Sequence, residues 1–513
     1  MQKEHPQNVL AFMQRQLRNM EFSSKQDPMD NARQDSGEAG FYWTLEELLQ
    51  GAEGTLLGTL AELGEVHFDS ISTDTRTLQP GALYIAIKGE HFDGHDFVSE
   101  AVKQGAAAVL VSEAVDTIVP GVLVEDTRLA LGQFAQWHRR RMPLKKLIAI
   151  TGSNGKTTVK GMLLNIFSEV GRTLATQGNL NNDFGVPRTL LELRPEHEYA
   201  IIEMGANHLK EIEYLSLMAE PDIALLNNAS GAHLEGFGSL QGVIEAKGEI
   251  FLGLNRLNQG GVAVINTDSP GFEYWLSQLQ HLEVERIWRF GESKQADVCL
   301  SDYQSLGDRI GFDLLVNQQK QTVTMPLLGK HNALNAAACA AVALAAGLDW
   351  KFILTGLQNF SGVAGRLHKR KIGQGWLIDD SYNANPESVK AAIQTLSSLP
   401  GESMLCLGVM AELGLESAAS HAMIAEYARS QGLKYLFVTG DATRKMPSLF
   451  GEKGEWFADH ERMAQQILQR ILSGEVDNVL VKGSRSAKME KVVELIQQGL
   501  SRHGHTKDED TKG

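Results

Sequence analysis

The stretch LIAITGSNGKTT, residues 147–158, limits what this chain can fold into more than any other segment. Its first four residues are apolar and predict a short buried strand, and the rest turns into a helix that continues to Phe167. Between strand and helix, Gly152 and Gly155 let main-chain N–H groups approach an anion, and the helix N-terminus adds its dipole. This arrangement predicts a cradle for the phosphates of a nucleotide. The alternative is a tight turn with a solvated lysine.

Two side chains of this loop have expected roles in phosphate chemistry. We expect Lys156 to lie in an exposed loop and reach the β- and γ-phosphates of a nucleotide, and we expect the Thr157 hydroxyl to hold Mg²⁺. The loop is shorter than the usual GxxxxGK[ST] pattern, so the strand-to-helix context carries the interpretation. The residues predicted to bind nucleotide here are Gly152, Ser153, Asn154, Gly155, Lys156, Thr157 and Thr158.

Composition and charge argue against several classes of protein. A net charge of −15 argues against a nucleic-acid backbone as the main partner. The longest apolar stretch, Ala336–Leu348, is too short for a bilayer, which needs about 20 residues, so we expect no membrane insertion. Cys299, Cys339 and Cys406 lie far apart in apolar or strand-like segments, which predicts buried thiols in a reducing compartment. We expect a cytoplasmic protein and a monomer.

The chain length predicts about three domains, and alternating strand and helix patterns predict the α/β class. Expected central strands at 147–150, 199–203, 222–228 and 262–266 predict a mostly parallel P-loop sheet with helices on both faces. Residues 296–327 predict an antiparallel addition to it. The expected divisions are a disordered extension at 1–40, a small N-terminal α/β domain at 41–143, the central P-loop domain at 144–357, a C-terminal Rossmann-like α/β domain at 358–501, and a polar tail at 502–513.

Polar side chains cluster in the first α/β segment. Ser72, Asp74 and Arg76 precede a Pro-Gly turn, and a second polar group runs from Lys88 to His95. One interpretation is turn chemistry alone. The other is a polar ligand site built from hydroxyls, a guanidinium and an imidazole. The residues by themselves leave both interpretations open.

The central segment carries further candidates. Glu203 ends the strand YAIIE, where an acid beside the phosphate loop is placed to bind Mg²⁺. His233 follows another strand end, and we expect it in the site. Lys247 lies between two acids, a pattern typical of an exposed ion-pair partner. Asn332 and Asn335, at the start of an alanine-rich helix, place amides where they can read a nucleotide base.

Several motifs, taken together and in order, resemble the Mur ligases. They are TGSNGKTT, GNLNNDFGVP, EMGANH, HLEGFGSL, AKGEI, GKHNALNA, GRL, DDSYNANP and LVKGSRS, within residues 41–500. DSYNANP, with MAELG and KGSRS, resembles the member of this family whose amine substrate is D-alanyl-D-alanine. Val409 is a departure, because the family commonly has an acid at this position.

The resemblance implies a reaction, two cofactors and two substrates. ATP phosphorylates the terminal carboxylate of a UDP-N-acetylmuramoyl-tripeptide, the amine of D-alanyl-D-alanine attacks the acyl phosphate, and phosphate leaves. Mg²⁺ ions offset the repulsion between the carboxylate and the γ-phosphate. The resemblance also implies that the first domain holds UDP, the second ATP and the third the dipeptide.

The resemblance further implies roles for individual residues. The implied catalytic set is Lys156, Lys247, Arg366 and His233. The implied metal ligands are Thr157, Glu203, His233 and Lys247, the last of them as a carbamate. The implied contacts with adenine, ribose and the transferred phosphate are Asn332, Asn335, Arg366 and Asp380. The implied substrate-binding residues are Ser72, Asp74, Arg76, Lys88, His95, Asn181, Asn182, Asn383, Asn385, Lys482, Ser484 and Arg485.

Three alternatives stay open at this point. One is a sister ligase that adds a different amino acid, and another is a folylpolyglutamate-type synthetase; only the C-terminal loops separate these from the leading interpretation. The third is a P-loop switch or scaffold that hydrolyses ATP to drive a partner. Dependence of ADP release on both an acyl acceptor and an amine separates a ligase from such a switch.

Overall fold

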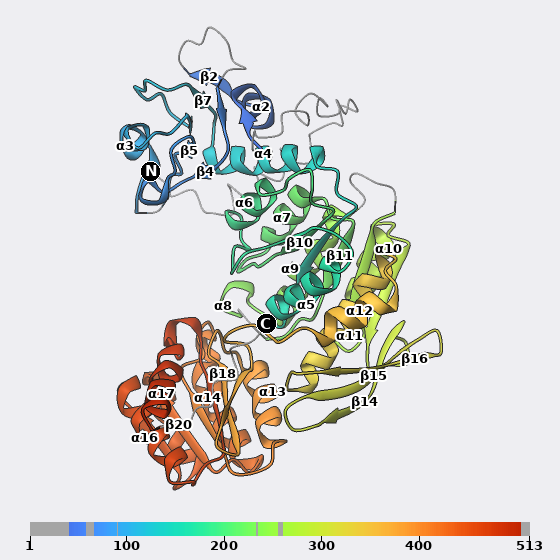
Figure 1. Ribbon diagram of the computed structural model, residues 1–513, viewed down its shortest axis with the longest axis vertical. Helices are drawn as coiled ribbons and strands as arrows, with labels where there is room; N and C mark the ends of the chain where they lie inside the picture. Colours follow the sequence, from blue (N-terminus) through green and yellow to red (C-terminus); the bar gives the residue numbers. More distant parts are fainter. Residues whose placement is uncertain (1–40, 58–65, 90, 232–233, 255–259, 504–513) are drawn as a thin grey trace.

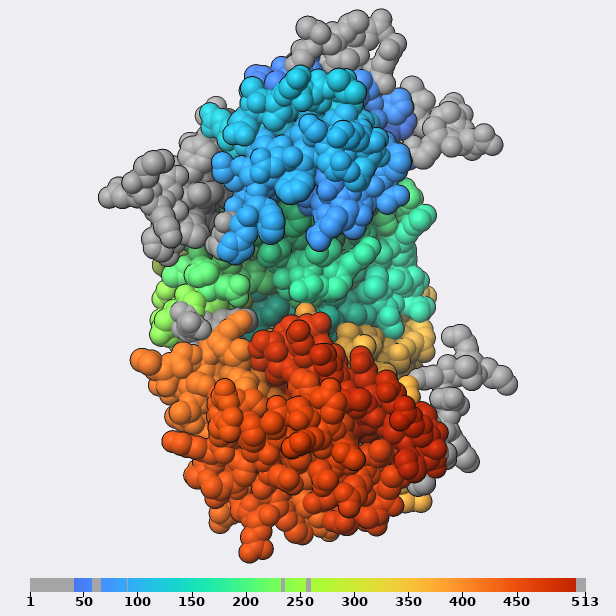
Figure 2. All heavy atoms as spheres, turned by 90° about the vertical axis from the view of Figure 1, so that its left-hand side faces the viewer, coloured from blue at the N-terminus to red at the C-terminus, as the bar shows by residue number. Residues whose placement is uncertain are grey.

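The computed structural model describes residues 41–57, 66–89, 91–231, 234–254 and 260–503, and the side chains of 234 and 235 are not described. Three α/β parts follow one another along the long axis of the molecule, with the N-terminal part at one end and the C-terminal part at the other (Figure 1). The side view shows the same order, with the central part between the two ends (Figure 2). The expected extension at 1–40 and most of the expected tail lie outside the described residues.

The first part is built on a sheet with the strand order β2-β7-β6-β5-β4, in which β2 is antiparallel to β7 and the other neighbours are parallel. A separate pair, β1 and β3, is antiparallel. The elements of this part are β1 (Trp43–Thr44), α2 (Leu45–Gly51), β2 (Thr55–Leu57), β3 (His67–Phe68), β4 (Ile71–Ser72), η3 (Thr75–Thr77), β5 (Leu83–Ile85), η4 (Gly94–Phe97), α3 (Val98–Lys103), β6 (Ala108–Val111), β7 (Gly121–Leu123) and α4 (Thr127–Arg141).

The central part is built on a long sheet with the strand order β16-β15-β14-β13-β12-β11-β8-β10-β9. Its elements are β8 (Lys146–Thr151), α5 (Lys156–Ser168), β9 (Thr173–Ala175), α6 (Gly185–Leu191), β10 (Tyr199–Glu203), α7 (Glu211–Ala219), β11 (Ile223–Leu226), α8 (Leu234–Phe237), α9 (Leu240–Gly248), η5 (Glu249–Gly253), β12 (Val262–Asn266), α10 (Phe272–His281), β13 (Arg286–Gly291), β14 (Val298–Ser305), β15 (Ile310–Val316), β16 (Gln319–Met325), α11 (Lys330–Ala345) and α12 (Trp350–Gln358).

The order of the central strands positions the phosphate loop. β8 pairs in parallel with β10 on one side and with β11 on the other. The strands that follow β8 in the sequence therefore lie on both sides of it in the sheet. In parallel sheets, ligands bind beyond the strand C-termini at such a switch point. The loop that follows β8 therefore lies where this rule places a nucleotide. The antiparallel β14, β15 and β16 extend the same sheet through a parallel pairing of β14 with β13, as the pattern at 296–327 predicted.

Alternation along β8 divides its side chains between two cores. Ile148 and Ile150 pack with α5, α11 and α12 on one face of the sheet. Leu147 and Ala149 pack on the other face, against α6, α7, α9 and α10. Because successive strand residues point to opposite faces, a wholly apolar strand is typical of a sheet that helices cover on both sides. The second core continues through α4 into the first part, so α4 joins the two parts by apolar packing.

The C-terminal part repeats this arrangement with the strand order β17-β18-β22-β19-β20-β21, parallel except for β17. Its elements are β17 (His368–Ile372), β18 (Gly375–Asp380), α13 (Pro386–Ser397), β19 (Ser403–Leu407), η6 (Gly414–Glu416), α14 (Ser417–Ser430), β20 (Tyr435–Thr439), η7 (Asp441–Thr443), α15 (Met446–Phe450), β21 (Gly454–Phe457), α16 (His460–Leu472), β22 (Asn478–Lys482), η8 (Arg485–Ala487) and α17 (Glu490–Arg502). α13, α14 and α15 cover one face and α16 and α17 the other.

These observations confirm the predicted α/β class. The predicted central strands correspond to β8, β10, β11 and β12 within two residues at each end. Within the described residues, no helix is both long and apolar enough to cross a membrane. The three cysteines are free, but Cys299 is only half-buried, so the expectation of three buried thiols is wrong for this residue. Cys299 lies in β14, the third strand from one end of the central sheet.

Candidate active site

The phosphate loop is held in a conformation that its glycines allow. β8 ends at Thr151 and α5 begins at Lys156. Gly155, directly before the helix, has a φ of +83°, which L-residues with a side chain rarely adopt. A Cβ at Gly155 would lie 2.6 Å from Oδ1 of Asn335. The backbone therefore turns tightly into the helix, and its first N–H groups face the open end of the sheet, where they suit an anion.

Amides that follow β11 fix the middle of this loop. The main-chain N–H of Asn154 donates to Oδ1 of Asn228 over 2.9 Å, and Nδ2 of Asn227 donates to the carbonyl of Asn154 over 3.0 Å. Nδ2 of Asn227 also donates to Oδ1 of Asn335 at 3.0 Å, so the predicted base-reading helix contacts the loop. Sequence reasoning did not select Asn227 and Asn228. The sequence did contain a signal for them, because polar residues at the C-terminal end of a parallel strand lie where such sheets bind ligands.

Lys156 is partly buried, so the expectation of an exposed loop is wrong for it. As the first residue of α5, it folds back, and its Nζ donates to the carbonyl of Gly152 over 2.5 Å. Burial lowers the pKa of Lys156, and the nearby Arg366 guanidinium lowers it further, while the Glu203 carboxylate opposes both effects. Lys156 therefore points across its own loop, into the space that phosphates would occupy.

An oxygen-rich cluster forms beside Lys156. Oε1 of Glu203 lies 3.5 Å from Oγ1 of Thr157 and accepts a 2.9 Å hydrogen bond from Nδ2 of Asn181. Glu203 is 2% exposed, at the C-terminus of β10. A carboxylate and a hydroxyl at this separation suit a hard cation such as Mg²⁺, which prefers oxygen ligands. The structure thus brings together Thr157 and Glu203, two of the predicted metal ligands, while His233 lies outside the described residues.

Lys247 is buried, so its interpretation as an exposed ion-pair partner is wrong. It lies on α9 with 2% of its surface exposed, and its Nζ is 5.4 Å from the centre of the Phe237 ring. Burial lowers the pKa of Lys247 to about 7, and the charge on Lys156 adds to this effect. α9 packs against α7, α8 and α10, which buries Lys247 although its acidic neighbours in the sequence indicate an exposed face. The side chain also lines the cavity described next.

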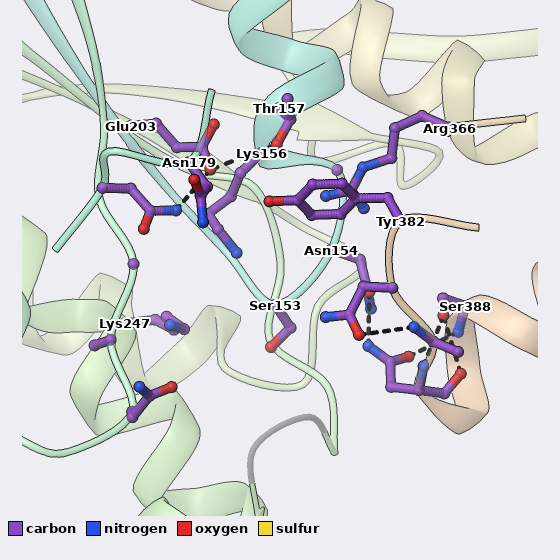
Figure 3. Close-up of a pocket in the computed structure, with 18 of the residues that line it drawn as sticks. Ser153, Asn154, Lys156, Thr157, Asn179, Glu203, Lys247, Arg366, Tyr382 and Ser388 are labelled. Atoms are coloured by element: carbon purple, nitrogen blue, oxygen red, sulfur yellow. Dashed lines mark hydrogen bonds between the residues drawn. The ribbon is translucent and has the colours of Figure 1, made fainter. Parts of the chain in front are cut away.

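A cavity of about 230 Å³ lies between the phosphate loop and the C-terminal part (Figure 3). In the close-up, Lys156, Glu203 and Lys247 lie on one side and Arg366, Tyr382 and Ser388 on the other (Figure 3). The predicted site residues that line it are Ser153, Asn154, Gly155, Lys156, Thr157, Asn181, Asn182, Glu203, Lys247, Arg366, Asn383, Asn385 and Lys482. Asn179 and Tyr382 also line it and were not predicted. The site is therefore completed by two parts of the chain.

A second cavity of about 240 Å³ shares Arg366 and Lys482 with the first. It is lined by the predicted nucleotide contacts Asn332, Asn335 and Asp380. Nδ2 of Asn332 donates to the carbonyl of Leu328 over 2.8 Å, and Nδ2 of Asn335 donates to Oδ1 of Asn332 over 3.2 Å. The polar start of α11 therefore faces a cavity, which explains why amides occur at the start of a helix otherwise packed in the core.

Charged groups from the C-terminal part meet at the boundary of the two cavities. The Arg366 guanidinium carbon lies 4.1 Å from the centre of the Tyr382 ring. Nζ of Lys482 is 2.6 Å from Oδ2 of Asp380 and donates to the carbonyl of Asn383 over 2.9 Å. Burial lowers the pKa of Lys482, while the Asp380 carboxylate opposes this effect. This pairing keeps a buried cation and anion close to the phosphate loop.

Other predicted residues lie outside both cavities. Arg485 is exposed, and its Nη1 lies 3.1 Å from Oε1 of Glu490. Ser484 is buried, and its hydroxyl lies 3.1 Å from that of Ser486. The main-chain carbonyl of Val409 accepts a 2.9 Å bond from the N–H of Ser484, so this backbone contact does not depend on the departure at position 409.

The polar groups of the first part also lie outside the two cavities. The Arg76 guanidinium pairs with the Asp74 carboxylate at 2.6 Å, and the Ser72 hydroxyl donates to the carbonyl of Asp74 over 2.9 Å. Nζ of Lys88 lies 3.2 Å from Asp93. His95 is buried, its Nδ1 lies 2.6 Å from the same carboxylate, and its Nε2 accepts from the N–H of residue 112. These contacts account for the turns and leave the guanidinium and ammonium groups at the surface.

Comparison with known proteins assigns the chain to a family. Family models match in three places: "Mur ligase family, catalytic domain" at 67–139, "Mur ligase middle domain" at 150–343, and "Mur ligase, glutamate ligase domain" at 365–485. A UDP-N-acetylmuramoyl-tripeptide–D-alanyl-D-alanine ligase from Escherichia coli is 42% identical over 457 residues, covering 89% of this chain and 98% of that protein. The chain belongs to the Mur ligase family. This confirms the resemblance, and with it the assignment as a ligase.

Solved structures support the same assignment. The structure of MurF from Acinetobacter baumannii has a TM-score of 0.82 and 34% identity with this Mur ligase, covering 89% of this chain and 99% of that one. MurF ligase from Thermotoga maritima, solved in complex with ADP, has a TM-score of 0.75 and 27% identity, covering 85% and 98%. The arrangement of the three parts is therefore shared with other Mur ligases.

Proposed function

We propose that this Mur ligase joins D-alanyl-D-alanine to UDP-N-acetylmuramoyl-tripeptide and converts ATP to ADP and phosphate. The observation that carries the proposal is that Lys156, Glu203 and Arg366 line one and the same cavity. This cavity combines a phosphate loop, an oxygen cluster suited to a metal ion, and a guanidinium from the C-terminal part. Relatives that match 85–89% of this chain, over 94–98% of their own length, carry the name of this activity.

The residues of the cavity fit Mg²⁺. Thr157 and Glu203 would hold a first ion, and Lys247, as a carbamate, would hold a second together with His233. An unmodified ammonium has no lone pair for a metal, whereas a carbamate supplies an anionic oxygen. When bound, Mg²⁺ neutralises charge on the phosphates and on the attacking carboxylate. Burial of Lys247 supports this role, because burial favours the neutral amine that reacts with CO₂.

The chain's own residues then have the following roles. Main-chain N–H groups at the start of α5 and Nζ of Lys156 hold the β- and γ-phosphates. The Arg366 guanidinium, held against Tyr382, neutralises charge on the transferred phosphoryl group. Asn181, which donates to Glu203, and Asn182 line the same cavity and would contact the substrate carboxylate. The dipeptide amine would approach from the C-terminal part, beside Asn383 and Lys482.

We propose that each of the three domains binds a different substrate. Residues 41–143 bind the UDP group, residues 144–357 bind ATP through the phosphate loop and the amides of α11, and residues 358–501 bind the dipeptide. Asp380 contacts the ribose from the second cavity. The polar groups around Arg76 and Lys88 provide exposed cations for a diphosphate. We also propose that the enzyme acts in the cytoplasm, where its free thiols stay reduced, and as a monomer.

The test measures ADP release with UDP-muramoyl peptides of different lengths and with a panel of amines. We expect release that requires both the tripeptide and D-alanyl-D-alanine, with the pentapeptide detected by mass spectrometry. Lys156→Ala is the inactive control, and its circular dichroism spectrum should match that of the wild type. A preference for another amine would assign the chain to a sister ligase or to a folylpolyglutamate-type synthetase. ATP hydrolysis that neither substrate stimulates would reject a ligase.

A further inference from the structure

Lys160 lies behind the active-site cavity, and the roles proposed above do not use it. It belongs to α5, one turn after Lys156, and its side chain is 9% exposed. Its Nζ donates to the carbonyl of Gly178 over 2.9 Å and lies 3.3 Å from Oε2 of Glu203. The side chain does not line either cavity of the site. A buried ammonium destabilises the fold unless it is paired. The contacts with Gly178 and Glu203 therefore hold the ammonium group in this position.

The two oxygens of the Glu203 carboxylate have different surroundings. Oε1 faces the cavity side, where it accepts from Asn181 and lies 3.5 Å from the Thr157 hydroxyl. Oε2 is buried and accepts no hydrogen bond from the described residues, and its close cation is Lys160. Oε1 accepts from Asn181 and, over the longer distance, from the Thr157 hydroxyl, whose proton can rotate away when a cation binds. Because a carboxylate oxygen has two lone-pair positions, Oε1 then keeps one for the ion.

The second contact of Lys160 reaches the loop that carries the asparagines. Gly178 precedes Asn179, Asn181 and Asn182, all of which line the cavity. The same loop contacts the segment after Glu203, because the N–H of Gly205 donates to the carbonyl of Asn181 over 2.8 Å. Lys160 therefore joins three elements, namely α5, the end of β10 and the asparagine loop.

We propose that Lys160 is a positioning residue that orients Glu203, so that Oε1 and the Thr157 hydroxyl form one cation site and the asparagine loop stays against it. The ion pair at Oε2 fixes the rotation of the carboxylate about its last side-chain bond. The hydrogen bond from Lys160 to the carbonyl of Gly178 holds the asparagine loop beside the Glu203 carboxylate. This inference rests on the proposed function, because it concerns the metal ion that accompanies the nucleotide.

The test compares Lys160→Met, which removes the charge at similar length, with Lys160→Arg, which keeps it. The main readout is the affinity for Mn²⁺ in the presence of ADP, measured by electron paramagnetic resonance. Residues that orient a metal ligand affect metal affinity about 10-fold to 100-fold, so we expect at least about a tenfold loss in Lys160→Met. We expect partial recovery in Lys160→Arg, and ADP affinity in EDTA within about twofold of wild type, because Lys160 lies behind the cavity.

Each outcome decides the role of Lys160. Unchanged or tighter Mn²⁺ binding in Lys160→Met would overturn the proposal and leave Lys160 as a neutralising or structural residue. A lower melting temperature with unchanged Mn²⁺ affinity would overturn it in the same way. If Lys160→Met does not fold, Lys160→Gln is measured instead, because it keeps a donor for Gly178 without the charge. Absence of Mn²⁺·ADP binding in the wild type would count against the proposed function itself, which separates the two failures.

Discussion

Nδ2 of Asn385 donates a 2.8 Å hydrogen bond to Oδ1 of Asn154, across 231 positions of sequence. Asn154 lies in the phosphate loop, and Asn385 is the N-cap of α13 in the C-terminal part. Oδ1 of Asn385 accepts from the N–H of Ser388, so one side chain both begins the helix and contacts the loop. The position of the C-terminal part is thereby coupled to the geometry of the nucleotide site.

This coupling is measurable in a double-mutant cycle. We expect Asn154→Ala and Asn385→Ala to lower kcat/KM for ATP, with a non-additive term of about 0.5–1.5 kcal/mol, the usual net value of one hydrogen bond. Asn385→Asp is the matched control, since aspartate keeps the N-cap acceptor but lacks the donor. We expect it to lower kcat/KM while leaving the melting temperature close to that of wild type. Strictly additive effects would contradict the coupling.

Lys247→Ala should nearly abolish ligase activity, because it removes the proposed carbamate oxygen from the cation site. Short carboxylates such as formate or acetate should restore part of the activity by filling the vacated position. The measurement is the ADP release rate against carboxylate concentration, with chloride at equal ionic strength as the control. An active Lys247→Ala enzyme would reject the role of Lys247. An inactive variant that no carboxylate rescues would argue against the carbamate.

Arg485→Ala should raise KM for D-alanyl-D-alanine about tenfold or more, the cost of losing a charge-assisted contact, while KM for ATP changes little. The exposed guanidinium lies on the C-terminal part, paired with Glu490, and a guanidinium can bind a carboxylate in bidentate fashion. Glu490→Gln is the control, because it removes the ion pair of Arg485 but keeps the guanidinium, so KM should stay near wild type. Equal effects on the two KM values would show that this loop is not the dipeptide site.

His138 predicts a pH dependence of stability. Its Nδ1 accepts from the Trp43 indole over 3.1 Å, which leaves Nε2–H to donate to the carbonyl of Leu193 over 3.0 Å. Burial lowers the pKa of His138 to about 4 from the usual 6.5. Between these values the unfolded chain binds a proton that the native state does not. This contribution to stability is therefore present above pH 6.5 and lost as the pH falls toward 4.

The measurement is urea unfolding of wild type and His138→Gln at pH 7, 6 and 5, followed by tryptophan fluorescence. Glutamine can accept from Trp43 and donate to Leu193, but it does not titrate. We expect the stability difference between the two proteins to shift in favour of His138→Gln as the pH falls, by up to about 1.4 kcal/mol per pH unit. Parallel pH profiles would mean that the pKa of His138 is not lowered in the native state.

Local sequence patterns were enough to predict much of the fold. The apolar run at 147–150, the glycines at 152 and 155, and Glu203 at a strand end each carry their structural signal within a few residues. The structure places Thr157 and Glu203 together because parallel neighbouring strands end at the same edge. The burial of Lys247 was not predictable in this way. Its acidic neighbours indicate an exposed helix face, and only the packing of α9 against α7, α8 and α10 shows otherwise.

Within the sequence, short-range periodicity and motif spacing determined the α/β class and the phosphate loop. The resemblance to the Mur ligases supplied the family and most of the predicted residues that line the cavity. Tertiary structure decided the rest. Three contacts join residues that are 43 to 231 positions apart in the sequence, and no local pattern predicts them. They are Asn154 with Asn385, Lys160 with Glu203, and Lys482 with Asp380. Such contacts depend on how sheets and helices pack, and packing is a property of the whole chain.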